Sequence, residues 1–229
     1  MFPSALVERL IECFTTSEDE YILDPFMGSG STILAADRRQ KTGIGLEISP
    51  EYIELTNKRL AQSTLFGEQK KHSLIRDDAR NLLTHVAPDT IDLCVTSPPY
   101  WDILSQKRTA DNKAIRDYGD AGEDLGKIAD YGQFLDLLTH VFSSVLQVVK
   151  PGKYCVVNVM DLRKKDAFFP FHSDLAQRLQ GVGWIYDDVI IWDRRMEYNN
   201  LRPLGYPCVF RINKIHEYLL VFKKPPRSG

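Results

Sequence analysis

The feature that most constrains the fold is the alternation of short apolar runs with longer segments that carry apolar residues on one face. The apolar runs predict strands, at residues 21–23, 42–46, 73–75, 91–95, 154–159, 184–192 and 215–223. The amphipathic segments predict helices, at residues 2–14, 33–36, 49–65, 131–149 and 171–180. This order predicts an α/β fold, a doubly wound, mostly parallel seven-stranded sheet with helices on both faces. No helix separates the last two strands, so we expect them to form an antiparallel pair at one edge.

Composition limits the classes of protein that need to be considered. The 229 residues fit one domain, and 29 Lys and Arg against 31 Asp and Glu leave a formal charge of −2. Any surface for nucleic acid must therefore be local. The four cysteines form no C-x-x-C pair, which argues against structural zinc and favours a reducing cytoplasm. No signal peptide and no long apolar span is present, so we expect no membrane association. The cysteine spacing leads us to expect no metal.

Two stretches lack a clear period and read as long loops inserted in a single domain spanning residues 1–229. Residues 102–130 are rich in Gly, Asp and Lys, and a loop of that length in a compact domain is usually functional. Its acids accompany its bases, so we expect a lid or a protein contact. Residues 193–214 interleave arginines with tyrosines and asparagines, which predicts a DNA-contacting loop.

A rigid corner follows the fourth predicted strand, at Thr96-Ser97-Pro98-Pro99-Tyr100. The prolines end the strand and fix the backbone. In open α/β sheets ligands bind at this carboxyl edge. The corner offers a hydroxyl on Ser97, free carbonyls and the ring of Tyr100, a set that suits a planar base with an exocyclic amino group. The alternative is a proline turn that only terminates a strand.

Three other predicted strands end in acids, Asp24, Glu47 and Asp78. The glycines of Gly28-Ser29-Gly30 let the backbone approach a ligand closely. Ile33 stands where a dinucleotide fingerprint needs its third glycine, and no G-K-[ST] follows. No Lys or Arg enters the turn, so we expect a neutral or cationic ligand, with Glu47 accepting from ribose hydroxyls and Asp78 from an adenine amino group. Alternatively, Asp24 and Asp78 are only turn and helix-cap acids.

These segments together resemble the amino-methyltransferases of bacterial DNA, enzymes that use S-adenosyl-L-methionine to methylate exocyclic nitrogens. The resemblance covers nearly the whole chain and includes Val149-Lys150-Pro151-Gly152 and His216-Glu217-Tyr218. It implies a catalytic tetrapeptide of Ser97, Pro98, Pro99 and Tyr100. It implies a cofactor site made of Phe2, Pro3, Asp24, Pro25, Phe26, Gly28, Ser29, Gly30, Ser31, Thr32, Glu47, Ile48, Asp78, Ala79 and Thr96.

The order of the motifs differs from that of the commonest members of this family, which place the catalytic segment first. Here the cofactor half, residues 1–65, comes first, and residues 66–71 lie where the usual ends would be joined. The chain therefore resembles a circularly permuted member, which a fold with neighbouring termini tolerates. We find no separate target-recognition domain, so the source of sequence specificity stays open.

The resemblance implies methyl transfer to a base flipped out of duplex DNA, with acceptors around the amino group and Tyr100 stacked on the base. Serine in the first tetrapeptide position resembles the cytosine-directed members, so we predict N4 of cytosine as the target, with N6 of adenine as the nearest competitor. Methylation of an RNA base or a protein amide, or a cofactor-binding regulatory module without activity, are alternatives. A homodimer and a separate specificity subunit both remain open.

Local basic groups mark the predicted DNA interface, because phosphates require cations and base edges are read by Arg, Asn and Gln. We expect removal of Arg194 and Arg195 to weaken DNA binding and to lower its salt dependence. The predicted DNA-contacting residues are Trp101, Arg163, Lys164, Lys165, Arg194, Arg195, Arg202 and Arg211. Each could instead belong to an ordinary solvated surface.

Overall fold

The computed structural model describes residues 2–63, 70–101, 128, 130–164, 166–196, 203–204 and 211–227. Its helices are α1 (Ser4–Phe14), α2 (Ser31–Arg38), α3 (Pro50–Ser63), the 3-10 helix η2 (Ala79–Thr84), α4 (Tyr131–Val148) and α5 (Phe171–Gly181). The strands of the main sheet are β1 (Tyr21–Asp24), β2 (Thr42–Leu46), β3 (Ser73–Ile75), β4 (Ile91–Thr96), β5 (Val149–Val159), β8 (Ile185–Asp193) and β11 (His216–Lys223).

The seven strands form one sheet in the order β3-β2-β1-β4-β5-β11-β8. The first five are parallel to one another, whereas β11 is antiparallel to both β5 and β8. The predicted doubly wound, mostly parallel sheet is therefore confirmed, and so is the antiparallel pair at one edge, where β8 is outermost. All six residues of β4 are buried, as expected for a parallel strand covered on both faces.

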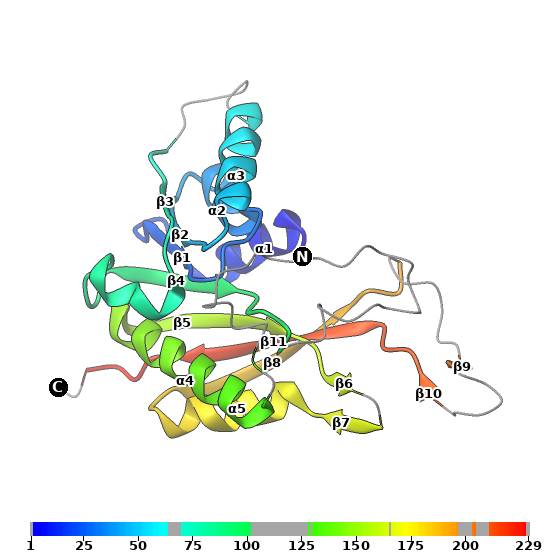
Figure 1. Cartoon of the computed structure of the whole chain (residues 1–229). Coiled ribbons are helices and arrows are strands. Elements are labelled where there is room, and N and C mark those ends of the chain that lie inside the picture. Colours follow the sequence, from blue (N-terminus) through cyan, green and yellow to red (C-terminus); the bar gives the residue numbers. More distant parts are fainter. Residues whose placement is uncertain are drawn as a thin grey trace.

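Helices cover the two faces of the sheet as separate layers (Figure 1). On one face α1 packs on α2 and β4, and α2 packs on β1, β2 and α3. On the other face α4 packs on η2, α5 and β5, and α5 contacts β8 and β11. Each helix directs an apolar stripe to the sheet; that of α4 includes Phe134, Leu138, Val141, Phe142 and Val145.

The sheet topology brings the predicted functional segments to one edge. The carboxyl ends of β1, β2, β3, β4 and β5 share this edge because the five strands are parallel. Because β11 is antiparallel to β5, it begins at this edge with His216, and β8 ends there with Asp193. The chain thus delivers six strand ends and one strand start to a single side of the molecule, where ligands bind in open α/β sheets.

Some local structure was not predicted from the sequence. A small antiparallel hairpin, β6 (Leu162–Lys164) with β7 (Ala167–Phe169), follows β5. The stretch 193–214, predicted to be irregular, contains the short strands β9 (Pro203–Leu204) and β10 (Arg211–Ile212), which pair with each other. Of the predicted lid, residues 102–130, only Ile128 and Asp130 lie within the described residues. Within the described part of the chain, no helix is both long and apolar enough to cross a membrane.

Candidate active site

Asp24 joins the predicted cofactor turn, residues 25–32, to the predicted catalytic corner, residues 96–100. It is the last residue of β1 and only 2% exposed. Its Oδ2 accepts from Thr32 Oγ1 at 2.6 Å, at the start of α2, and its Oδ1 accepts from Thr96 Oγ1 at 2.6 Å, at the end of β4. Burial raises the pKa of Asp24 to about 6 against the opposing effect of these hydrogen bonds. Because Thr96 precedes Ser97, one buried carboxyl group aligns the two predicted segments.

Glu47 supports the same turn from the end of β2. Its Oε2 accepts from the Gly28 backbone N–H at 2.8 Å, and its Oε1 accepts from the Ser49 N–H at 2.9 Å. The side chain is largely buried, and this burial raises the pKa of the carboxyl group. Two buried carboxyl groups beside one glycine turn favour a cationic ligand, because a nearby positive charge offsets the cost of keeping a carboxylate away from water.

The two glycines of this turn face different surroundings. Both have left-handed backbones, with φ of 51° at Gly28 and 77° at Gly30. A Cβ on Gly30 would lie 2.3 Å from Thr56 Cγ2 on α3, whereas a Cβ on Gly28 would meet no atom closer than 4.0 Å. Gly30 therefore permits helix packing, and Gly28 leaves its side of the turn open to an approaching molecule.

A cation does contact the turn, which corrects the expectation that none enters it. Arg59, on α3, donates through Nη1 to the Ser29 carbonyl and to Ser29 Oγ, the latter at 3.1 Å. Sequence reasoning missed Arg59 because it lies 30 positions along the chain and reaches the turn only once α3 has packed. Its charge is engaged by protein acceptors.

Asp78 is positioned at the predicted edge but is already engaged within the protein. It is 6% exposed and caps η2 by accepting from the Arg80 N–H at 2.7 Å. The Arg80 guanidinium donates to both of its oxygens, at 2.9 and 2.8 Å. This is the helix-cap alternative stated above. An additional contact with an adenine amino group stays a prediction, since each carboxylate oxygen has two acceptor positions.

The other predicted cofactor residues lie in the turn itself, just before α1, after β2, at the start of η2 and at the end of β4. Phe2 is buried in the cluster between α1 and the sheet, and Pro3 is the exposed N-cap of α1. Phe26 is half-buried, with its ring centroid 6.4 Å from that of Phe142. The remaining residues are buried, apart from the half-buried Ile48: Pro25, Ser31, Thr32, Ala79 and Thr96.

The catalytic corner leaves the sheet as expected for a proline turn. Ser97, Pro99 and Tyr100 are half-buried and Pro98 is buried. The Tyr100 hydroxyl donates to Glu217 Oε2 at 3.3 Å. Burial, followed by the nearby charge of Glu217, raises the pKa of Tyr100 well above its ordinary value, so the phenol stays protonated and remains a hydrogen-bond donor.

Two of the predicted DNA contacts are buried and bound to protein partners in the structure. Trp101 is 4% exposed and donates through Nε1 to the Ile128 carbonyl at 2.7 Å, within an aromatic cluster that includes Tyr131. Arg194 is 8% exposed and forms an ion pair with Glu217. An indole is apolar except at its N–H, and a guanidinium beside a buried carboxylate gains more from that partner than from solvent. Both side chains are therefore internal.

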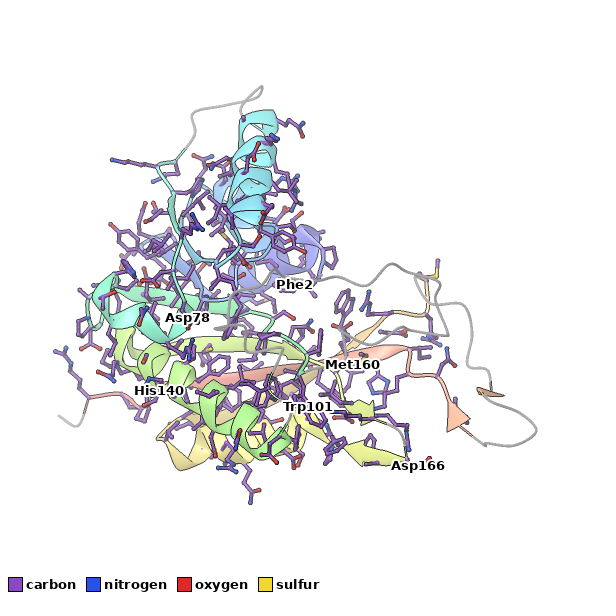
Figure 2. All side chains as sticks on the ribbon, in the orientation of Figure 1. Phe2, Asp78, Trp101, His140, Met160 and Asp166 are labelled. Carbon is purple, nitrogen blue, oxygen red and sulfur yellow. The ribbon has the colours of Figure 1, made fainter. Side chains whose placement is uncertain are left out.

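The remaining predicted DNA contacts differ in exposure. Arg163 and Arg195 are exposed, whereas Lys164 is half-buried, with Nζ 4.1 Å from the centre of the Trp101 ring. Arg195 forms an ion pair with Asp193. Lys165, Arg202 and the side chain of Arg211 lie outside the described residues. Figure 2 shows Trp101 and Met160 at the base of the β6–β7 hairpin and Asp166 at its tip.

Comparison with known proteins decides the family. A model of a family described as DNA methylase matches residues 1–58 and 91–228. The chain belongs to this DNA methylase family. Over 65 residues the chain is 40% identical to the Type II methyltransferase M2.LlaDCHI of Lactococcus lactis subsp. cremoris, a match that covers 28% of this chain and 24% of that protein. It is 25% identical over 174 residues to the Type II methyltransferase M.MjaI of Methanocaldococcus jannaschii, covering 67% of this chain and 55% of that protein.

Alignments with these relatives span from about a quarter to just over half of their length. Among solved structures, a SAM-dependent methyltransferase from Methanosarcina mazei superposes with a TM-score of 0.60 at 15% identity, covering 95% of this chain and 98% of that one. At this identity the similarity shows a shared fold. The chain thus has a Rossmann-like methyltransferase fold.

Proposed function

We propose that the methylase transfers a methyl group from S-adenosyl-L-methionine to the exocyclic amino group of a base flipped out of double-stranded DNA, and that this atom is N4 of cytosine. The observation that carries the proposal is the pair of hydrogen bonds from Thr32 and Thr96 to Asp24. They couple a glycine turn suited to a cationic ligand with a corner suited to an amino group. A donor and an acceptor of a methyl group must meet in this way.

The residues around the turn fit this cofactor. Gly28 leaves open space on its side of the turn, and Asp24 and Glu47 have pKa values raised by burial, so a positive charge nearby stabilises their ionised forms. When bound, S-adenosyl-L-methionine supplies an electrophilic methyl group on a sulfonium centre. The chain holds it through the residues named above, with Glu47 assigned to the ribose hydroxyls and Asp78 to the adenine.

The corner prepares the target nitrogen. An aromatic amine is a poor nucleophile because its lone pair is delocalised into the ring. Acceptors at Ser97 Oγ and the Pro98 carbonyl would favour a tetrahedral nitrogen and free that lone pair. Stacking on Tyr100 contributes roughly 1–3 kcal/mol per base, which offsets part of the cost of extrusion. The proton leaves after the nitrogen becomes cationic, so no strong base is required.

The experiment uses the methylase, S-adenosyl-L-methionine labelled in its methyl group, and duplex DNA that is then digested to nucleosides. We expect the label in N4-methyl-2′-deoxycytidine. The Ser97→Ala variant, which loses one acceptor, should methylate DNA at a rate at least about 10-fold lower. Label found only in methyladenine would overturn the cytosine assignment and keep the class of reaction. Label in RNA or protein but not in DNA would overturn the assignment of DNA as the substrate.

The order of the segments is part of the proposal. The cofactor turn precedes the catalytic corner along the chain. In the main sheet β11 lies between β5 and the edge strand β8. We therefore retain the interpretation of a circularly permuted family member, with specificity supplied by its loops, by a second copy of the chain or by another subunit.

A further inference from the structure

A buried polar network lies behind the catalytic corner and has Glu217 at its centre. Glu217 is 5% exposed. Its Oε2 accepts from Asn158 Nδ2 at 2.7 Å and from the Tyr100 hydroxyl at 3.3 Å, and its other oxygen pairs with Arg194. A carboxylate out of contact with water requires partners of this kind, and three different segments supply them.

The network is built at the carboxyl edge of the sheet. Asn158 is on β5, Glu217 is on β11, and Arg194 follows β8. The strand register pairs Leu219 with Asn158, and Glu217 with Trp192. Arg194 is held in turn, because its guanidinium carbon lies 4.6 Å from the centre of the Trp192 ring. Strands from both sides of β11 therefore fix the position of the carboxylate.

One acceptor in this network is not used by the protein. Asn158 is 2% exposed, and its Oδ1 has no hydrogen-bond donor among the described residues. The amide cannot be reversed without turning its oxygen toward Glu217, so the orientation is set by the carboxylate. A buried acceptor without a donor is costly, and this one belongs to the residue that shares Glu217 Oε2 with the Tyr100 hydroxyl.

We propose that Glu217 is a positioning residue for methyl transfer, which holds the Tyr100 phenol so that the ring keeps one orientation for the flipped base. The inference rests on the proposed function and deepens it. The backbone of the tetrapeptide restrains one end of the Tyr100 side chain, and the hydrogen bond to Glu217 restrains the other. Without the second restraint the phenol keeps only its hydrogen bond with Ser97, and the ring is held less firmly in alignment with the acceptors on Ser97 and Pro98.

The direct test is Tyr100→Phe, which keeps the stacking ring and removes only the hydroxyl. We expect kcat to fall on the order of 10-fold, as for loss of a hydrogen bond to a charged group, with the affinity for S-adenosyl-L-methionine unchanged by calorimetry. Tyr154→Phe is the matched control, because Tyr154 lies in the middle of β5, four residues before Asn158, and its ring packs at a tilt against that of Phe14. A Tyr100→Phe enzyme with the wild-type kcat would overturn the proposal.

Glu217 is tested in a background that avoids leaving Arg194 buried and uncompensated. Arg194→Met/Glu217→Gln keeps an acceptor for Tyr100, whereas Arg194→Met/Glu217→Leu removes it. We expect the Gln variant to retain about 10-fold more activity than the Leu variant, and Tyr100→Phe to lower the rate further only in the Gln background. Equal activities of the two variants would contradict a positioning role. So would a further loss of rate when Tyr100→Phe is added to the Leu background.

The same variants separate this inference from the proposed function. If the wild-type protein transfers no methyl group to DNA, the proposed function fails. The contact is then judged from unfolding in denaturant: the effect of Tyr100→Phe on the midpoint should be larger in the Gln background than in the Leu background. Equal effects would show that the hydroxyl and the carboxylate do not interact, whatever the substrate.

Discussion

At the scale of the residue, ionisation of the Asp24 carboxyl group is expected to lower the stability of the fold and to favour a cationic ligand. Burial raises its pKa from 3.8 to about 6 in the folded chain. A shift of about two units corresponds to ~3 kcal/mol. Because the folded pKa is the higher one, the folded state binds the proton more tightly. The contribution to stability is complete below about pH 4 and is lost as the pH rises through about 6.

The prediction concerns the difference between the wild type and Asp24→Asn. In urea titrations from pH 4 to pH 7, we expect the free energy of unfolding of the wild type to decrease relative to that of the variant by up to ~3 kcal/mol. The amide of Asn can still accept from one of the two threonine hydroxyls through Oδ1 and donate to the other through Nδ2, so the fold should be preserved. A constant difference between the two proteins across this range would contradict the raised pKa.

The same ionisation should affect the cofactor in the opposite direction. S-adenosyl-L-methionine carries a positive charge, and the ionised forms of Asp24 and Glu47 favour it. By linkage, the affinity measured by calorimetry should increase from pH 5 to pH 7, with protons released on binding. S-adenosylhomocysteine, which lacks the sulfonium charge, is the control and should show a smaller pH dependence.

At the scale of the element, the turn between β1 and α2 predicts different effects for its two glycines. Gly30→Ala places a Cβ 2.3 Å from Thr56 in a left-handed backbone. We expect this change to lower the free energy of unfolding by roughly 2–4 kcal/mol, the sum of backbone strain and overpacking. Gly28→Ala adds a methyl group in open space, so only the strain of about 1–2 kcal/mol remains.

Cofactor affinity should rank the two variants in the other order. A methyl group on Gly28 occupies the open side of the turn. Calorimetry should therefore show a larger loss of cofactor affinity for Gly28→Ala than for Gly30→Ala. If Gly28→Ala bound S-adenosyl-L-methionine as tightly as the wild type, the open side of the turn would not be the cofactor side.

The elements of this chain could be predicted because their apolar periods are strong. The seven strands and five α-helices follow directly from such patterns, and so does the meeting of Asp24, Glu47 and Thr96 at one edge. The hairpin β6–β7 and the helix η2 were not predicted from the sequence, because each is a short segment held by tertiary contacts. In sequence Asp78 looks like a ligand acid, yet the structure has it capping η2 and bound to Arg80.

Charged side chains of the site were the hardest to predict, because burial decides their role and burial is set by distant segments. Arg194 and Arg195 are adjacent in sequence and both looked like phosphate contacts. Arg194 is 8% exposed because Glu217, 23 residues away, supplies a buried partner, whereas the Arg195 side chain is 69% exposed. A basic cluster in sequence therefore does not show which of its members face a polyanion.

At the scale of the whole molecule, the net charge of −2 implies that a surface for the proposed DNA substrate is local, and the proposed function places it near the carboxyl edge. Arg163 on β6 and Arg195 after β8 are exposed there. They differ in their neighbours: Arg195 pairs with Asp193, while Arg163 has no ion pair among the described residues and lies 5.3 Å from the centre of the Phe168 ring. Neutralising a phosphate requires an uncompensated cation, so Arg163 should contribute more.

DNA binding measured against salt concentration tests this difference. Each uncompensated phosphate contact adds roughly 0.9 to the slope of log K against log salt. We expect Arg163→Ala to reduce the slope by about that amount, Arg195→Ala to reduce it by less, and Asp193→Asn to increase the affinity by releasing Arg195. Arg9→Ala on α1, whose guanidinium already pairs with Glu12, should leave the slope unchanged. If Arg163→Ala and Arg9→Ala gave the same slope as the wild type, the hairpin would not be part of the DNA interface, and the attraction would have to arise from other segments of the chain.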